Sequence, residues 1–591
     1  MIRKFFKAFA LLALLGASTS CSDFLDQESD HVIYADKSHL NNATDTIYSV
    51  IGIMNKLQSI ADRTILLGEV RGDLMDINEN TSSDLRDLSL FNVGNENKYN
   101  SPRDYYAIIN NCNYFIAKAD IDLKNNRNET IFLKEFAAVK AFRAWTYLQL
   151  VLNYGEVPFY TDPILTKAES EIDYPKKNIQ EVCQYFISDL AELADIETPS
   201  YGTIRSNDSK LFYFPIYILL GDLNLWAGNY KEAALNYYYY ISRRNGTNVA
   251  YPTGTASIRW SQNDSHWRSM RDSWGTDFYN ENNNRTSELI SMIPGDSIPS
   301  EGNYSELRNL FNCNETNDYK VSLKPSQSII DLSASQPYCH LTTGNDVVYA
   351  PTGLTENRTG DLRLSSAWSY TKDVRIRTSG SNRELSEYSY INKYSTRNVH
   401  IYRRTMVYLR MAEALNRAGY PRFAFEILKN GVNNRSIESN VIPYYTADST
   451  WIRQFDFPNN DYVLESRSGQ QTENTMGIHG RGSGFSFLDD KYVLPDDTTI
   501  TDSIMRRDYQ IIRVEDMIVD EEALEFAFEG YRFYDLMRVA LRRNNPSYLA
   551  DRIYKRRGAA QEAVMKGLIR HDLNDTRSWY LNWNNKIGLG Y

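Results

Sequence analysis

The sequence predicts a mostly α-helical protein in which helical hairpins form a scaffold that long, loop-rich insertions interrupt. Apolar residues recur at helical spacing over about 37–60, 102–120, 131–153 and 178–194. Between about 245 and 400 this periodicity fades, and Ser, Asn, Thr, Gly and Asp dominate. These two observations indicate a repeat scaffold with insertions, and long loops of this kind are usually functional.

The predicted helices have recognisable ends. Ser101 and Pro102 open the second helix, with the serine as N-cap and the proline in the first turn. The third helix stops at Gly155, shortly before Pro158. Helical patterns return near 517–543 and 547–567, after a second polar stretch over about 436–505.

Two segments look like copies of one helical hairpin. Each has a turn glycine, a small residue seven positions before it and an alanine five positions after it: Gly221, Gly228 and Ala233 in one copy, Ala412, Gly419 and Ala424 in the other. The pattern resembles the tetratricopeptide unit, in which small residues let two antiparallel helices approach. A generic hairpin would explain one copy, but two copies favour the repeat. Because one pair cannot bury its apolar face alone, the two earlier pairs of predicted helices are the additional members.

These patterns divide the chain. We expect an N-terminal helical region over 37–245, a loop-rich insertion over 246–400 as the candidate ligand-binding part, a last helical pair over 401–435 and a C-terminal region over 436–591. The glycine-rich loop 477–484 lacks the lysine and the strand-to-helix setting of a phosphate loop, which favours a flexible turn.

Residues 1–20 have the features of an export signal. Arg3, Lys4 and Lys7 precede an apolar run, Phe9 to Leu15, that is too short to span a bilayer. Small residues then lead to Cys21. A signal that ends on cysteine resembles a bacterial lipoprotein lipobox, which implies cleavage before Cys21 and acylation of its thiol. The alternative is an ordinary secretory signal followed by a chance cysteine.

The residues after Cys21 are predicted to form a tether, over 21–36. Three acidic residues lie within 22–28, and in lipoproteins of the type this resembles, such a stretch accompanies export to the cell exterior. No second long apolar run follows, so the acyl chains would be the only membrane attachment visible in the sequence. The net charge of −10, without a long basic run, argues against nucleic-acid binding.

The other cysteines are too irregularly spaced for a zinc or redox motif. Cys112 and Cys183 lie in apolar helical patterns, where cysteine acts as a small hydrophobic residue. Cys313 and Cys339 lie in loop-rich sequence, where they either pair in an oxidising compartment or stay free.

Aromatic residues are the main chemical resource of the chain, with 43 Tyr, 24 Phe and 9 Trp. Trp260, Trp267 and Trp274 recur every seven residues among polar side chains, Trp368 has similar surroundings, and Tyr279 and Tyr304 are near in sequence. Flat rings offer apolar area on which sugar C–H faces stack, while neighbouring polar groups orient the hydroxyls. Three such platforms with a few hydrogen bonds would supply about 4 kcal/mol, near millimolar affinity. Alternatively, these rings belong to the core.

The loop of about 68–100, between the first two helices, is a second candidate surface. It carries Arg71, Asp73 and Asp76 followed by several asparagines. The alternative is a polar surface loop in which Arg71 pairs with Asp73 or with Asp76.

Four long stretches resemble the SusD/RagB family of outer-membrane nutrient-binding lipoproteins, and they occur in the family's order. They are Cys21–Asp26, Lys140–Phe159 with its Tyr-Gly-Glu-Val-Pro ending, Tyr408–Asn416 and Glu525–Arg538. The C-terminus departs from the family, because Gly588–Tyr591 lacks the proline of the usual Pro-Gly-Tyr ending. Charged residues of these motifs are expected to be framework pairs rather than ligand contacts: Arg143, Arg410, Glu413, Glu529, Arg532 and Asp535. No binding residue carries over by motif.

The resemblance implies a lipid-anchored outer-membrane protein, facing the cell exterior, that captures a glycan and delivers it to a SusC-like TonB-dependent transporter. Capture of peptides or of another nutrient is the alternative. We expect no cofactor and identify no metal ligands, and the sequence leaves open whether a structural ion is bound. The seven histidines form no metalloprotease motif, and no nucleophile elbow occurs. A glycosidase carboxylate pair is compatible with the sequence, but no residues mark one.

Overall fold

The structure is a computed structural model that describes residues 43–243, 396–457 and 477–582. Between these ranges it describes 258–260, 270–272, 274–275, 288–295, 305–311, 321–341, 346–350, 360–371 and 388–394. The predicted signal and tether, with Cys21, lie outside the described residues, as does the C-terminal tail.

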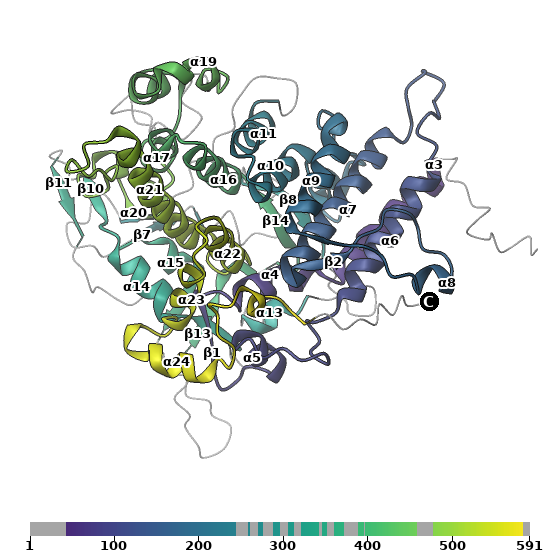
Figure 1. The fold of residues 1–591 in the computed structure, drawn as a ribbon, viewed down its shortest axis with the longest axis horizontal. Helices are drawn as coiled ribbons and strands as arrows, with labels where there is room; N and C mark the ends of the chain where they lie inside the picture. The colour runs from purple at the N-terminus through teal and green to yellow at the C-terminus, as the bar shows by residue number, and fades with distance from the viewer. Residues whose placement is uncertain are drawn as a thin grey trace, which may run out of the picture.

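One array of helices forms the scaffold (Figure 1). In order these are α3 (Ala43–Gln58), α6 (Pro102–Lys118), α7 (Leu133–Tyr154), α9 (Ile179–Leu190), α10 (Ile216–Ala227), α11 (Tyr230–Arg243), α16 (Arg404–Arg417) and α17 (Pro421–Lys429). Each contacts the next, including α11 and α16 across the long insertion. The predicted helical pairs are confirmed, and the fold is the mostly α-helical, tetratricopeptide-like scaffold that the sequence predicts.

Glycines make the close approaches of this array possible. Gly228 caps α10 with φ 83°, a left-handed conformation that glycine adopts without a steric penalty. A Cβ on Gly221 would lie 2.4 Å from a ring carbon of Tyr237, because α10 and α11 touch at this point. The two helices can approach this closely only because the hairpin motif has small residues at the contact.

A second group of helices covers one side of the array. It comprises α21 (Ser503–Phe526), α22 (Arg532–Arg542), α23 (Ser547–Tyr554) and α24 (Glu562–Leu568). The prediction of a single helix over 517–543 is wrong. The helix α21 begins earlier, at Ser503, and a non-helical turn separates it from α22. Phe528 and Gly530 have positive φ there, and both backbone N–H groups donate to the Glu69 carboxylate at 2.9 Å.

The insertion contains regular elements as well as loops. It holds α13 (Leu307–Leu310), α14 (Gln327–Ser335), α15 (Arg363–Ala367) and the antiparallel pairs β6–β7 (Ile258–Trp260, Met270–Asp272), β10–β11 (Cys339–Leu341, Val347–Tyr349) and β12–β13 (Trp368–Thr371, Tyr388–Ile391). Two further pairs connect it to the scaffold: β8 (Leu289–Ile293) with β14 (Val399–Arg403), and β9 (Leu323–Pro325) with β1 (Met75–Ile77). The insertion is thus fastened to both the N-terminal and the C-terminal parts.

The remaining described elements are short. They are α4 (Ala61–Glu69), α5 (Ser83–Ser89), α8 (Lys167–Ser170), α18 (Asn434–Ser436), α19 (Ser449–Ile452), α20 (Gly480–Ser483), and the pairs β2–β3 (Glu156–Pro158, Lys176–Asn178) and β4–β5 (Thr203–Ile204, Asn207–Asp208). Within the described part of the chain, no helix is both long enough and apolar enough to span a bilayer.

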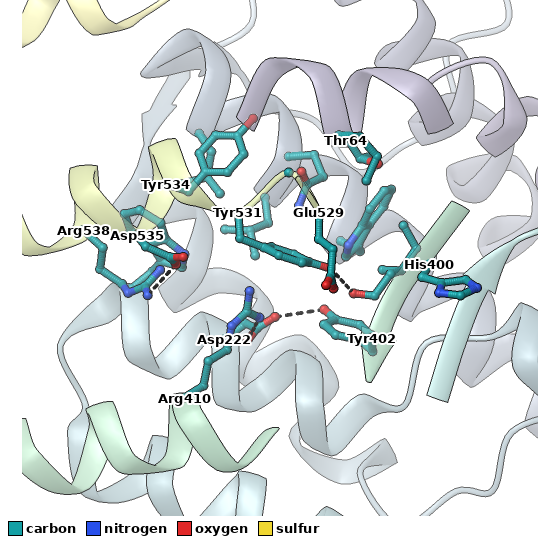
Figure 2. A pocket seen from close by; sticks show the side chains of 18 residues that line it. Thr64, Asp222, His400, Tyr402, Arg410, Glu529, Tyr531, Tyr534, Asp535 and Arg538 are labelled. Atoms are coloured by element: carbon teal, nitrogen blue, oxygen red, sulfur yellow. Dashed lines mark hydrogen bonds and ion pairs between the residues drawn. The ribbon is translucent and has the colours of Figure 1, made fainter. Parts of the chain in front are cut away.

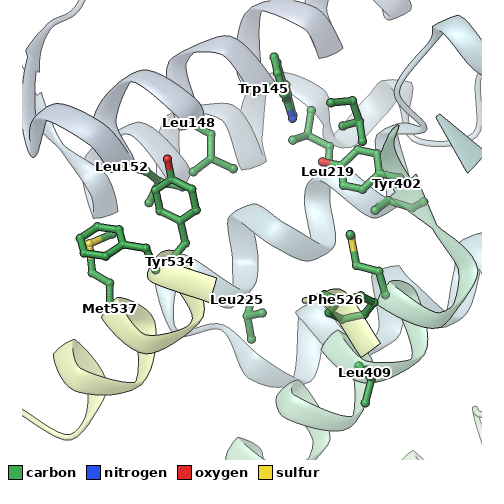
Figure 3. Close-up of a cluster of buried hydrophobic side chains, with 14 of the residues drawn as sticks. Trp145, Leu148, Leu152, Leu219, Leu225, Tyr402, Leu409, Phe526, Tyr534 and Met537 are labelled. Atoms are coloured by element: carbon green, nitrogen blue, oxygen red, sulfur yellow. The ribbon is translucent and has the colours of Figure 1, made fainter. Parts of the chain in front are cut away.

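The hydrophobic core lies where the array meets the C-terminal helices (Figure 3). Leu148 and Leu152 of α7 lie beside Tyr534 of α22, while Leu409 of α16 lies beside Phe526 of α21. All five side chains are buried. Burying each side chain of this size contributes about 1.5–3 kcal/mol, so the two groups of helices stabilise each other.

The motif charges are framework pairs, as predicted. Each bonds an opposite charge: Arg143 to Asp189 (3.0 Å), Arg410 to Asp222 (2.6 Å), Glu413 and Asp535 to Arg538 (2.7 and 2.9 Å), Glu529 to Arg403 (2.8 Å) and Arg532 to Asp73 (2.6 Å). Most of these pairs connect segments that are far apart in the sequence, whereas Asp535 and Arg538 are both on α22.

The interpretation of 477–484 as a flexible turn is wrong. The segment is buried: His479 donates to or accepts from Glu521 at 2.9 Å and stacks on Tyr492, and Arg481 bonds Glu288 at 2.6 Å. A Cβ on Gly482 would lie 2.1 Å from Asp361, so its glycine permits close packing.

The described cysteines are free and buried. Cys112 and Cys183 pack in the core as predicted, and burial raises the pKa of the Cys112 thiol to about 12. Cys339 is also free, while Cys313, its predicted alternative partner, lies outside the described residues.

Candidate functional site

The predicted aromatic platform is not exposed. Trp260, Trp274 and Trp368 are 4%, 0% and 5% exposed, so their ring faces are closed to a ligand. Trp267, Tyr279 and Tyr304 lie outside the described residues. The expectation of exposed, sugar-stacking rings is therefore wrong for the three described tryptophans.

Packing explains this burial. The Trp274 indole donates its N–H to Glu525 of α21 at 3.2 Å, and the Lys393 ammonium lies 4.9 Å from its ring. Trp260 belongs to a small separate cluster with Tyr338, and Trp368 belongs to the main core. Trp274 thus fastens the insertion to α21, whereas Trp260 packs within the insertion itself.

Arg71 is also buried and pairs with neither Asp73 nor Asp76. Its guanidinium donates to the carbonyl oxygens of Leu67 at 2.7 Å and Trp579 at 3.0 Å, and to the Asn153 side chain. It lies 4.2 Å from the ring centre of Phe533. Arg71 therefore ties α4 to the C-terminal segment, and the predicted pairing within the loop is wrong.

The two aspartates of this loop each bind a C-terminal arginine through two bonds. Asp73 accepts from Arg532 at 2.6 and 3.0 Å, and Asp76 accepts from Arg557 at 2.7 and 3.0 Å. Burial raises the pKa of Asp73, but Arg532 outweighs this effect and holds the pKa below its ordinary value. Each aspartate is therefore paired with an arginine of the C-terminal region.

One open groove lies beside this loop. Its volume is about 430 Å³, and it is lined by Asp73, Ser328, Asn545, Ser547, Tyr548, Asp551, Arg552 and Lys555. The last six belong to α23 or its ends, while Ser328 is on α14 of the insertion. Ligand pockets typically enclose about 300–1,000 Å³, so the groove has room for a small molecule or a short oligomer.

The residues that line the groove carry polar end groups on apolar stems, and the aromatic ring among them is covered. Two guanidinium groups lie over the Tyr548 ring, Arg552 at 3.8 Å and Arg543 at 4.6 Å. The Ser328 hydroxyl donates to the Lys555 carbonyl at 3.1 Å, and the Ser547 hydroxyl donates to Asn574 at 2.8 Å. A ligand would therefore meet hydroxyl, amide and charged groups rather than a stacking platform.

A second, interior cavity lies between α7, α10, α16 and α22 (Figure 2). At its floor, Asp222 accepts hydrogen bonds from Tyr402 at 2.9 Å and Arg410 at 2.6 Å. Burial lowers the pKa of the neighbouring His400 to about 4. The cavity measures about 50 Å³, which holds water but is far below the size of ligand pockets. Its polar groups serve the framework, and the groove is the better candidate for a ligand.

The groove brings together one predicted residue, Asp73, with residues that sequence reasoning missed. The sequence feature that could have indicated these residues is the basic run Lys555 to Arg557, which follows α23 and lies close to Arg552. Among the described residues, no group of three or more His, Cys, Asp or Glu is arranged to hold a metal ion.

No protein-family model matches the sequence. A SusD-like protein of Formosa agariphila is 21% identical in an alignment of 557 positions that covers 90% of this chain and 90% of that protein. The structure of a SusD superfamily protein of Bacteroides vulgatus covers 92% of this chain and 96% of its own, with a TM-score of 0.54 and 14% identity. A further Bacteroides vulgatus structure, named for a proposed role in sugar binding, covers 85% of this chain and 88% of its own, with a TM-score of 0.51 and 16% identity.

Proposed function

The chain has the fold of SusD-like proteins, and from this fold we propose that it is a carbohydrate-binding protein of the SusD type. We propose further that it is anchored to the outer membrane, faces the cell exterior and passes its glycan to a SusC-like TonB-dependent transporter. The fold likeness extends over nine-tenths of the chain, and one similar structure is named for sugar binding. The observation that carries the proposal is the open groove of about 430 Å³, which is lined by side chains with hydroxyl, amide and charged groups.

The groove offers the chemistry that sugar hydroxyls need. Asn545 provides both a donor and an acceptor, and Arg552 adds charged donors. The Ser328 and Ser547 hydroxyls, which donate to Lys555 and Asn574, can accept from a sugar hydroxyl. Binding rather than hydrolysis fits these groups. A glycosidase requires a carboxylic acid with a raised pKa, and of the two carboxylates in the groove lining, Asp73 does not supply it, because Arg532 keeps its pKa low.

A binding screen tests this proposal. The purified protein is titrated with soluble polysaccharides and, separately, with peptide mixtures, and binding is followed by affinity electrophoresis and calorimetry. We expect at least one polysaccharide to bind without release of shorter products. Binding of peptides alone would favour the alternative nutrient, and release of sugar products would contradict the binding role.

Matched variants locate the site. Asn545→Ala and Lys555→Ala change the groove, while Lys134→Ala changes a lysine of α7 that is exposed and pairs only with exposed Glu197. We expect the first two to weaken glycan binding and the third to bind as wild type. Equal binding by all three would place the glycan elsewhere.

Membrane attachment and transport are tested separately. Cys21→Ala is expected to release the protein from the membrane fraction, because the thiol for acylation is gone. A tagged wild-type protein, isolated from outer membranes, is expected to co-purify with a TonB-dependent transporter in comparable amount. Isolation without any such barrel would contradict the delivery step.

A further inference from the structure

Arg552 differs from the other arginines around the groove. Arg532 and Arg557 each hold an aspartate of the 73–76 turn through two hydrogen bonds. Among the described residues, no carboxylate lies at ion-pairing distance from the half-buried Arg552 guanidinium. Arg552 therefore faces the groove without a direct ion pair to a described residue, and its charge acts at longer range on Asp73 and Asp520.

The guanidinium of Arg552 is also held in place. Its Nη1 donates to the Tyr548 carbonyl at 3.0 Å, and its plane lies over the Tyr548 ring at 3.8 Å. The remaining N–H groups form a fork whose orientation is fixed before a ligand arrives. Such a fork fits the two oxygens of a carboxylate or sulfate, and prior orientation lowers the entropy cost of binding.

The other charges in the groove support the same chemistry. Lys555 is exposed, and Glu562 approaches its ammonium only to 3.9 Å. Asp73 is committed to Arg532, and the charge of Asp551 acts on Lys566 and Tyr554 near α24. Two cations, three residues apart on α23, are thus available to one ligand.

We propose that the groove recognises an acidic sugar, and that Arg552, assisted by Lys555, binds its carboxylate or sulfate group. This inference rests on the proposed carbohydrate-binding function and names its ligand class. Neutral hydroxyls of the same sugar would meet Asn545 and Ser328.

Pairs of polysaccharides that differ only in the acidic group provide the test. Polygalacturonate is compared with its fully methyl-esterified form, and a sulfated galactan is compared with its desulfated form, by calorimetry at low and high salt. We expect the wild-type protein to prefer the acidic member of at least one pair, with affinity that falls as salt rises. The two pairs distinguish a carboxylate from a sulfate.

Variants assign the preference to Arg552. Arg552→Gln is expected to lose about tenfold or more in affinity for the acidic polymer, and Arg552→Lys to lose less, because the charge remains but the fork is gone. Lys555→Gln, at an exposed position where folding is not at risk, is expected to weaken binding and its salt dependence. Arg127→Gln, the same charge change in an exposed turn between α6 and α7, is expected to bind as wild type.

The results separate two failures. If Arg552→Gln and Lys555→Gln bind the acidic polymer as wild type, or if the esterified and desulfated forms bind equally well, the acidic-sugar inference is overturned while carbohydrate binding stands. If no glycan of either kind binds, the proposed function falls as well.

Discussion

Arg532 donates two hydrogen bonds to the carboxylate of Asp73, at 2.6 and 3.0 Å, across a separation of 459 residues. Both side chains are about 5% exposed, so the pair is shielded from water. It joins α22 to the turn before β1 and fixes the wall of the groove. The groove is therefore formed jointly by the N-terminal part of the chain, through Asp73, and by the C-terminal helices.

Breaking this pair is expected to destabilise the protein. Asp73→Asn leaves the Arg532 charge buried without its partner, which typically costs about 3–5 kcal/mol. Thermal unfolding measures the effect, and Glu197→Gln, which removes an exposed pair with Lys134, is the control with little expected change. A double variant, Asp73→Ala with Arg532→Met, is expected to recover part of the loss because no unmatched charge remains. An Asp73→Asn protein as stable as wild type would contradict this account.

A matched pair of glycines tests the contact between α4 and the break after α21. A Cβ on Gly68 would lie 1.6 Å from the Gly530 carbonyl oxygen, whereas a Cβ on Gly52 in α3 would meet nothing within 4 Å. Alanine is a better helix former than glycine by about 1 kcal/mol, so Gly52→Ala is expected to stabilise the protein. Gly68→Ala is expected to destabilise it by about 1–3 kcal/mol through overpacking. Shifts of the melting temperature in the same direction would show that the contact is not tight.

The buried indoles are expected to act through stability. Trp274→Ala removes a fully buried ring, which typically costs about 3–5 kcal/mol, and leaves Glu525 without one donor. Thermal unfolding and glycan binding are measured on the same sample, and binding per folded molecule is expected to stay unchanged. The control is Tyr444→Ala, whose ring is 58% exposed, with little expected change in stability. A folded Trp274→Ala protein without glycan binding would restore the platform hypothesis.

The scaffold could be predicted because its signals are local. Apolar spacing, Pro102, Gly155 and Gly228 mark helices and their ends within a few residues, and the pairs of helices follow in chain order. The sequence also predicts that the motif charges form ion pairs, because charged residues in apolar helical patterns need partners. It does not predict which partners they have, since Asp73 and Asp222 are far from Arg532 and Arg410 in the sequence.

Features that depend on partners far away in the sequence could not be predicted. Gly530 is a local sign of the break after α21, but Glu69, which accepts from the freed backbone N–H groups, lies far away in the sequence. In the sequence, Trp274 resembles a binding residue because its neighbours are polar. Its packing partner, Glu525 of α21, lies 251 residues away, so its burial cannot be predicted locally. The groove combines α23 with α14 and the Asp73 turn, so only the tertiary fold assembles it.

Acid is expected to weaken the protein through Glu413. This carboxylate of α16 accepts from Arg538 at 2.7 and 2.8 Å and pairs with Arg542 at 2.6 Å. Burial raises its pKa, but Arg538 and Arg542 outweigh this effect and hold the pKa at about 2, below the ordinary 4.5. The unfolded chain therefore binds a proton between these values while the folded protein does not. The stability that Glu413 contributes is complete above pH 4.5 and is lost as the pH falls toward 2.

Glu413→Gln isolates this contribution. At pH 7 the variant is expected to be less stable than wild type by about 3 kcal/mol, because two buried arginines lose a shared carboxylate. The difference is expected to shrink as the pH falls from 4.5 to 2, because wild-type Glu413 is then protonated as well. Denaturant unfolding at a series of pH values measures it, with Glu438→Gln, in an exposed pair with Arg453, as the control. A difference that stays constant down to pH 2 would mean that the carboxylate charge of Glu413 does not hold α16 to α22.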